Sequence, residues 1–201
     1  MDYLIAILMG IAQGLTEFIP VSSTAHLRIL PELFHKNDLG AAFTAVIQIG
    51  TLLSLLVYFH RDIINLAKGF FTSLFRKDYK NPDFLLSLYI ITGTIPIVIL
   101  GILLKDLIEN QFRSMSVIAS SLIIFAILLI ASEILGKKGK DINNLNIKDA
   151  ILIGIAQSFA LIPGASRSGV TICMALFLGY KREAAARYSF LLSIPSVLGA
   201  G

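Results

Sequence analysis

The sequence predicts an all-α polytopic membrane protein: one integral membrane domain over residues 1–201, with several transmembrane helices and an inverted-topology repeat that carries two re-entrant broken helices. Three observations predict this class. Of the 201 residues, 56% are hydrophobic and 15% are charged, whereas about 25% are charged in a typical soluble domain. The apolar residues fall into runs about as long as the ~20 residues that a helix needs to cross a bilayer. A motif near the N-terminus also returns late in the chain.

Each apolar run predicts one element. Three runs are long enough to cross a bilayer as helices: residues 40–59, 84–104 and 115–135. Two shorter runs each stop at a proline followed by small hydroxyl-bearing residues, and they predict re-entrant half-helices: residues 4–19 and 151–162. A last run, residues 188–201, predicts a further membrane segment.

The basic residues between the runs predict the sides of the membrane. Residues 60–83 and 136–149 are richer in lysine and arginine than residues 105–114, so we expect the first two loops to be cytoplasmic. The basic residues form no single stripe, so we expect no nucleic-acid partner. Within the first loop a helical spacing predicts a short helix on the membrane surface, with a solvated loop as the alternative: Ile63, Leu66, Ala67, Phe70 and Leu74.

The repeated motif predicts the topology. The tetrapeptide GIAQ starts at Gly10 and again at Gly154, and each copy is followed by Ile-Pro and a serine. Three predicted crossings separate the copies, so the copies enter from opposite faces of the membrane, as in an inverted repeat. Repeat 1 is expected over about residues 1–135. Repeat 2 starts at about residue 150 and is incomplete, so we expect a truncated C-terminus.

The first copy of the motif carries candidate chemistry at its end. Gln13 and Glu17 are four residues apart and share one helix face. An ionisable residue inside an apolar run indicates a functional site, with a glutamate that reaches the membrane interface as the alternative. Ser22, Ser23 and Thr24 then open a new helix, whose free N–H groups favour an anion.

His26 lies one turn beyond these serines, within expected reach of a proton on a hydroxyl or a bound phosphate. Taken alone, His26 could also be an interface histidine and Ser22 a simple helix cap.

The second copy places an arginine between serines and glycines. Gly164 lets the backbone approach a ligand, Ser166 and Ser168 can donate hydrogen bonds, and Arg167 can grip phosphate oxygens with a two-pronged fork. A glycine-flanked turn with an arginine that reaches the interface is the alternative. The glycine spacing is not that of a P-loop, which argues against nucleotide binding. The single cysteine, Cys173, excludes an internal disulfide and a multi-cysteine metal site.

A carboxylate, an imidazole, hydroxyls and a guanidinium around one point in the membrane are the groups that phosphoryl hydrolysis requires. A phosphate on a lipid would present its head group there. Two other classes stay open: a transporter or lipid flippase that binds a phosphate-bearing ligand at the same site, and a structural or assembly subunit.

Two long motifs make the sequence similar to the undecaprenyl-diphosphate phosphatase family, the bacitracin-resistance membrane phosphatases. They are QGLTEFIPVSSTAH at residues 13–26 and PGASRSG at residues 163–169, followed by REAA at 182–185 and SFLLSIP at 189–195. The resemblance implies hydrolysis of undecaprenyl diphosphate to undecaprenyl phosphate and inorganic phosphate, which recycles the lipid carrier for cell-wall synthesis. It also implies a multi-pass protein of the cell (plasma or inner) membrane that requires a divalent cation, Mg²⁺ or Ca²⁺.

The resemblance also assigns roles to residues. Glu17, with or without Gln13, would handle the metal or the diphosphate, although Gln13 brings no charge. Ser23 and His26 would be the catalytic hydroxyl and acid/base groups, and Arg167 would hold the diphosphate. Further substrate-binding residues are expected among the flanking small residues: Ser22, Thr24, Gly164, Ser166 and Ser168. The nucleophile and the oligomeric state stay open, with a homodimer as one option.

Overall fold

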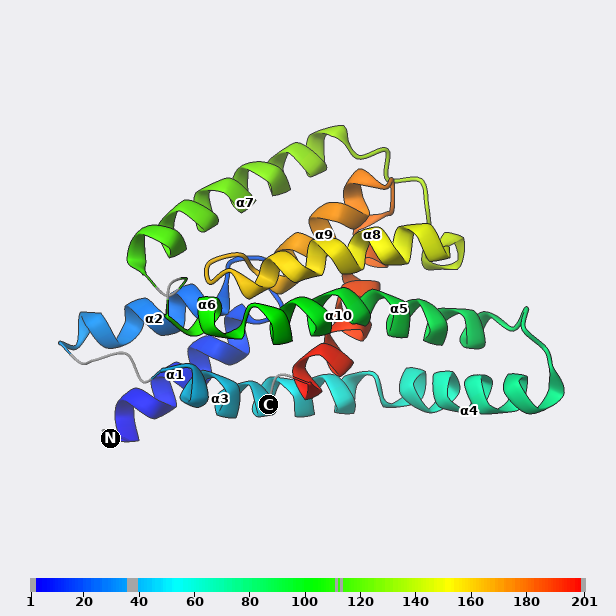
Figure 1. Cartoon of the computed structure of the whole chain (residues 1–201), viewed down its shortest axis with the longest axis horizontal. Helices are drawn as coiled ribbons and strands as arrows, with labels where there is room; N and C mark the ends of the chain where they lie inside the picture. The colour runs from blue at the N-terminus through cyan, green and yellow to red at the C-terminus, as the bar shows by residue number, and fades with distance from the viewer. Residues whose placement is uncertain (1–2, 36–39, 111, 113, 200–201) are drawn as a thin grey trace.

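The computed structural model describes residues 3–35, 40–110, 112 and 114–199, and these residues fold as helices without a β-strand (Figure 1). The prediction of an all-α fold is therefore confirmed. In chain order the α-helices and short 3₁₀ helices are α1 (Tyr3–Thr16), α2 (Ser23–Leu33), α3 (Gly40–Tyr58), α4 (His60–Arg76), α5 (Pro82–Leu103), α6 (Lys105–Asn110), α7 (Met115–Leu135), η1 (Ile142–Asn144), α8 (Ile147–Ser158), η2 (Phe159–Leu161), α9 (Arg167–Phe177) and α10 (Arg182–Leu198).

The two motif copies both fold as a helix, a break and a second helix. The first break separates α1 from α2, and the second separates α8 and η2 from α9. Each break contains a proline, Pro20 or Pro163, which has no N–H group to continue a helical hydrogen-bond ladder. In both copies the two helices pack against each other. The predicted broken helices are confirmed as breaks, whereas the repeat boundaries stay a prediction.

The membrane-spanning helices agree in part with the three predicted crossings. By length and composition, α5 and α7 can each cross a bilayer. The described part of α3 meets the same criteria for a membrane crossing only when it is counted together with α4, and this helix pair is bent by 73° at the break between them. In Figure 1, α7 runs along one edge of the molecule, α3 and α4 along the opposite edge, and α5, α8 and α9 between them.

The helix predicted in the first basic loop exists as α4, so the alternative of an irregular loop is wrong. It packs along α5, because a glycine at position 69 lets the helices approach: a Cβ there would lie 2.5 Å from the Cβ of Asp83. Ser87 of α5 also donates a hydrogen bond to the carbonyl oxygen of Leu66 (3.2 Å). Phe71 and Phe75 remain exposed on α4, as a helix at a membrane surface requires. Its depth in the membrane stays a prediction.

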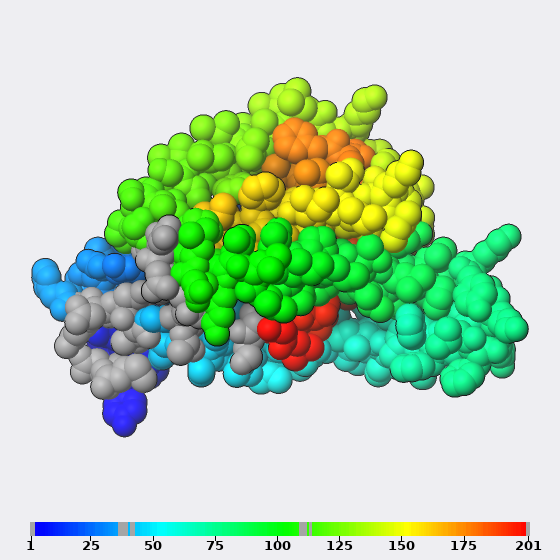
Figure 2. Space-filling model, viewed as in Figure 1, coloured from blue at the N-terminus to red at the C-terminus, as the bar shows by residue number. Residues whose placement is uncertain are grey.

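The core lies where α5, α8, α9 and α10 meet. Two glycines let the backbones of α5 and α8 touch, since a Cβ on Gly154 would lie 2.5 Å from the carbonyl oxygen of Gly93. Helices in membranes commonly pack through such small residues. α10 contacts α3, α5 and α9, and its end reaches the surface between α3 and α5 (Figure 2). Tyr188 of α10 donates to the carbonyl oxygen of Tyr89 of α5 (2.8 Å).

The outer surface is apolar where α7 faces away from the other helices. Four isoleucines spaced three or four residues apart are each more than half exposed: Ile123, Ile127, Ile130 and Ile134. Such a stripe has no favourable contact with water but matches the hydrocarbon of a bilayer. The protein is therefore an integral membrane protein.

Candidate functional site

A buried ion pair joins the two motif copies. The Arg167 guanidinium on α9 contacts the Glu17 carboxylate in the first break. Both side chains are largely buried, with 16% of the arginine side chain and 5% of the glutamate side chain exposed. Breaking a buried pair by removing one partner leaves an uncompensated charge, which is strongly destabilising. The contact joins two segments that lie far apart in the sequence.

Glu17 accepts two further hydrogen bonds on its other oxygen. Gln13 Nε2 donates to Glu17 Oε2 at 2.7 Å, as expected for residues four apart on one helix face. Ser23 Oγ donates to the same oxygen at 2.6 Å. Three donors therefore surround this carboxylate: Gln13, Ser23 and Arg167. The arrangement also gives Ser23 a proton acceptor at the distance that general-base catalysis requires.

Two helix N-termini point at the same region. Ser22 caps α2, with its hydroxyl accepting from the backbone N–H of Ala25 (3.3 Å). Ser166 caps α9 and accepts from the N–H of Gly169 (3.2 Å). Ser22 has a positive φ of 61°, a strained conformation that is uncommon outside glycine and often found at functional sites. Since each N-terminus carries a partial positive charge, the pair favours an anion between them.

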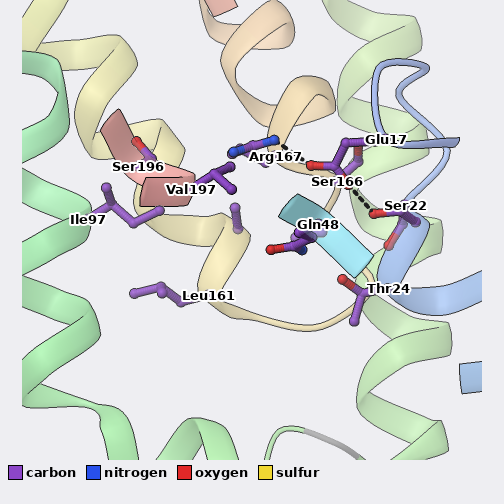
Figure 3. Close-up of a pocket in the computed structure, with 13 residues that line it drawn as sticks. Glu17, Ser22, Thr24, Gln48, Ile97, Leu161, Ser166, Arg167, Ser196 and Val197 are labelled. Carbon is purple, nitrogen blue, oxygen red and sulfur yellow. Dashed lines mark hydrogen bonds and ion pairs between the residues drawn. The ribbon is translucent and has the colours of Figure 1, made fainter. Parts of the chain in front are cut away.

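A cavity of about 150 Å³ lies between these groups (Figure 3). Its polar wall holds six of the predicted residues: Glu17, Ser22, Ser23, Thr24, Ser166 and Arg167. Other lining residues are apolar, among them Ile97, Leu161 and Val197. At about 30 Å³ per water molecule, the cavity has room for a phosphate-sized group beside the guanidinium.

Four predicted residues lie behind or beside the cavity wall. Gln13 is 1% exposed and supports Glu17 from behind. Ser168 donates to the backbone carbonyl of Glu17 (3.3 Å) and so ties α9 to the first break. Gly164 packs on α7, where Ser121 donates to the carbonyl oxygen of Pro163 (2.6 Å). These contacts give the three residues a positioning role.

His26, the fourth, is exposed, and its Nδ1 lies 2.9 Å from the backbone carbonyl oxygen of Ser22. This contact places one ring nitrogen on the backbone and away from the serine hydroxyls. Its role in proton transfer stays a prediction.

The sequence analysis missed polar residues that reach the cavity from other helices. Gln48 of α3 and Ser196 of α10 both line it. Arg167 also donates to the carbonyl oxygen of Ser193 on α10 (3.3 Å). An amide in the middle of an apolar run was the available signal for Gln48, since a polar side chain at membrane depth indicates function in the same way as a charged one.

The donor set around Glu17 bears on the cation that the resemblance implies. Among the described residues, no three His, Cys, Asp or Glu side chains group closely enough to hold a metal ion. Gln13 Oε1, however, is a buried acceptor to which the described part of the chain offers no donor. One carboxylate and one amide oxygen fit a magnesium ion that takes its remaining ligands from water and substrate phosphates.

The fold and the site define a class: a helical membrane protein in which two broken helices surround an anion-binding cavity with a carboxylate, serine hydroxyls and an arginine. The bacitracin resistance protein BacA family matches residues 6–201, and the chain belongs to that family. It is 52% identical to the undecaprenyl-diphosphatase of Nocardioides sp. (strain ATCC BAA-499 / JS614) over 201 residues, which are 100% of this chain and 73% of that protein.

Two further relatives are similar to the same degree. The undecaprenyl-diphosphatase of Corynebacterium glutamicum (strain R) is 51% identical over 195 residues, or 97% of this chain and 67% of that protein. The undecaprenyl-diphosphatase of Myxococcus xanthus (strain DK1622) is 51% identical over 202 residues, or 100% of this chain and 68% of that protein.

Proposed function

We propose that this protein is an undecaprenyl-diphosphatase, which hydrolyses undecaprenyl diphosphate to undecaprenyl phosphate and inorganic phosphate. The observation that carries the proposal is the cavity in which Arg167, Glu17 and Ser23 meet at two helix N-termini. Each of the three relatives above bears the same enzyme name. A transporter would need the arginine and the helix ends, but it would not need a hydroxyl in contact with a carboxylate.

The geometry supports a division of labour among these residues. Arg167 and the two helix N-termini bind the oxygens of the terminal phosphoryl group and stabilise its charge in the transition state. Ser23 is the hydroxyl best placed as the nucleophile, because its proton can pass to Glu17 Oε2 at 2.6 Å. Attack on the terminal phosphorus breaks its bond to the bridging oxygen, and the lipid phosphate leaves. Water then attacks the phosphorus of the phosphorylated serine and releases inorganic phosphate. Ser23 Oγ takes its proton back from Glu17.

We also propose that the enzyme uses a divalent cation, Mg²⁺ or Ca²⁺, held by Glu17 and by Gln13 Oε1, which has no donor among the described residues. Such a cation supplies neutralisation of the charge on the phosphate oxygens. Its requirement is tested by chelation with EDTA followed by titration with each metal.

The cell membrane is the proposed location, because the lipid substrate and the apolar outer surface both require a bilayer. The homodimer named above stays a prediction, and cross-linking in native membranes tests it.

The decisive experiment measures phosphate release from undecaprenyl diphosphate by the chain in proteoliposomes. Arg167→Ala is expected to lower kcat by about 10²- to 10³-fold, the usual effect of removing one donor to a developing charge. Arg182→Ala is the matched control, because Arg182 pairs with Glu133 on an exposed surface (2.6 Å). Glu17→Gln and Ser23→Ala should lose activity in the same way. Wild-type protein that binds the lipid without releasing phosphate would support the transporter instead.

A further inference from the structure

A glutamine from α3 faces the catalytic cavity from outside both motifs. Gln48 is the one amide side chain in α3, and it lines the cavity together with Arg167 and Leu161. Figure 3 shows it between the polar cluster of Glu17 and Ser166 and the apolar residues Leu161 and Val197. The bound lipid phosphate would therefore lie within reach of this amide.

The hydrogen bonds of α3 set Gln48 apart from its polar neighbours. The hydroxyls of Thr44, Thr51 and Ser54 each donate to a backbone carbonyl of their own helix, at 3.1, 2.8 and 3.1 Å. Within the described residues, the Gln48 amide forms no hydrogen bond. A polar group in an apolar environment is unfavourable unless it finds a partner. Its two N–H donors therefore remain available to a ligand.

Ser196, which also lines the cavity from outside the two motifs, cannot serve as the donor in the same way. Its single hydroxyl proton is directed to the carbonyl oxygen of Leu192 (3.0 Å) or to Gln157 Oε1 (3.2 Å). An anion needs donors, and among the described lining residues outside the two motifs the donor without a partner is Gln48 Nε2.

A diphosphate needs binding groups for two phosphoryl groups. In the proposed function, Arg167 and the helix N-termini bind the terminal phosphoryl group. The second phosphoryl group stays attached to the lipid, and it gains negative charge on the bridging oxygen when the bond to the terminal phosphorus breaks. A neutral amide can donate to this group without holding the product as tightly as a second arginine would.

We propose that Gln48 is a specificity-determining residue that binds the lipid-linked phosphoryl group, so that the enzyme recognises a lipid diphosphate by both of its phosphates. The proposal rests on the proposed function for the order of the two phosphates in the cavity.

The test measures binding separately from turnover. Dissociation constants are measured in detergent for farnesyl monophosphate, the methylene-bridged analogue of farnesyl diphosphate, and inorganic phosphate. Gln48→Leu is expected to weaken binding of both farnesyl ligands by about 10-fold or more, as the loss of a hydrogen bond to a charged group does. Binding of inorganic phosphate should stay unchanged. Arg167→Lys should weaken inorganic phosphate binding as well.

Two further variants keep the result interpretable. Gln48→Glu retains the shape of the side chain but adds a charge that repels phosphate, so it should weaken the farnesyl ligands more than Gln48→Leu does. Val46→Leu alters an exposed position of the same helix and should change none of the three constants. A thermal melt of each variant checks its folding.

The outcomes separate the two proposals. Equal weakening of all three ligands, or no change in any, overturns the role of Gln48. If the wild-type protein releases no phosphate, but Gln48→Leu still weakens binding of farnesyl monophosphate, the phosphatase function is refuted. The contact between Gln48 and the lipid phosphate is then supported. Phosphate release together with unchanged binding on Gln48→Leu refutes the contact alone.

Discussion

Replacing Gly164 by alanine is expected to disable the site without touching a residue that lines the cavity. Gly164 has a φ of +97°, and a Cβ there would lie 2.1 Å from Ser121 Oγ and 2.6 Å from the carbonyl oxygen of Ile118. A side chain in left-handed backbone costs about 1–2 kcal/mol, and overpacking adds about 1–3 kcal/mol. The expected loss of stability is therefore about 2–5 kcal/mol, or roughly 4–20 °C in Tm.

The same change should lower activity, because the clash displaces the start of α9. Arg167 is three residues further along, and a displacement of about 1 Å in a catalytic group can cost about 10²-fold in rate. Thermal melting in detergent and phosphate release are measured beside Gly10→Ala, where a Cβ would meet nothing within 4 Å. Adding Ser121→Gly should restore part of the stability by removing one of the two clashes. A Gly164→Ala protein that melts and turns over like Gly10→Ala would refute the reasoning.

Three other changes test the site and its surroundings. Ser22→Gly should be more stable than Ser22→Ala by about 1 kcal/mol in chemical denaturation, because glycine relieves the positive φ, and both should lose about tenfold in activity with the cavity hydroxyl. Gln13→Glu should lower the Mg²⁺ concentration for half-maximal activity by about tenfold, since a second carboxylate strengthens cation binding; an unchanged Mg²⁺ dependence would argue against a ligand at this position. Burial and the neighbouring Asp149 carboxylate raise the pKa of Tyr180 above its ordinary value. The contribution of Tyr180 to stability is therefore complete below about pH 10 and is lost as the pH rises further. Tyr180→Phe should reduce this alkaline loss in Tm and should cost about 1–3 kcal/mol of stability at neutral pH.

The sequence predicted those parts of the site that follow from local chain geometry. A proline followed by small hydroxyl-bearing residues favours the end of one helix and the start of another, so Pro20 and Pro163 indicated both breaks. Proline alone would not have been enough, because Pro31, Pro96 and Pro195 lie inside helices. Residues four apart share a helix face, so the contact of Gln13 with Glu17 followed from spacing alone. The repeat indicated that the two breaks meet, and the contact of Glu17 with Arg167 agrees with that expectation.

Features that depend on the packing of distant helices could not be predicted in this way. The contacts of α3 with α1 and α10 determine which face of α3 turns inward. From the sequence alone, Gln48 was therefore only a polar residue in an apolar run. The requirement for Gly164 arises from α7, more than forty residues earlier in the chain. The helical spacing predicted that His26 lies beside Ser22. The buried face of α2, however, is formed by Ala25, Leu27 and Pro31. The histidine is consequently turned outward.

The two motif copies supply similar scaffolds and different chemistry. In register with the shared Ile-Pro, the second copy has Ala160 and Leu161 where the first has Glu17 and Phe18, and it has Arg167 where the first has Thr24. Each copy alone would present a helix N-terminus and hydroxyls to the cavity. The negatively charged Glu17 and the positively charged Arg167 come from opposite copies. The ion pair therefore exists only where the two copies meet.

This asymmetry has a consequence for substrate binding. Glu17 and Arg167 cancel each other's formal charge, and two helix N-termini contribute only about +0.5 each. A diphosphate brings several negative charges into a membrane cavity, where uncompensated charge is costly. Arg167 would face both the Glu17 carboxylate and the phosphates, and a single guanidinium does not neutralise both. A divalent cation held by Glu17 and Gln13 would supply the missing positive charge, which is the physical reason to propose one for this site.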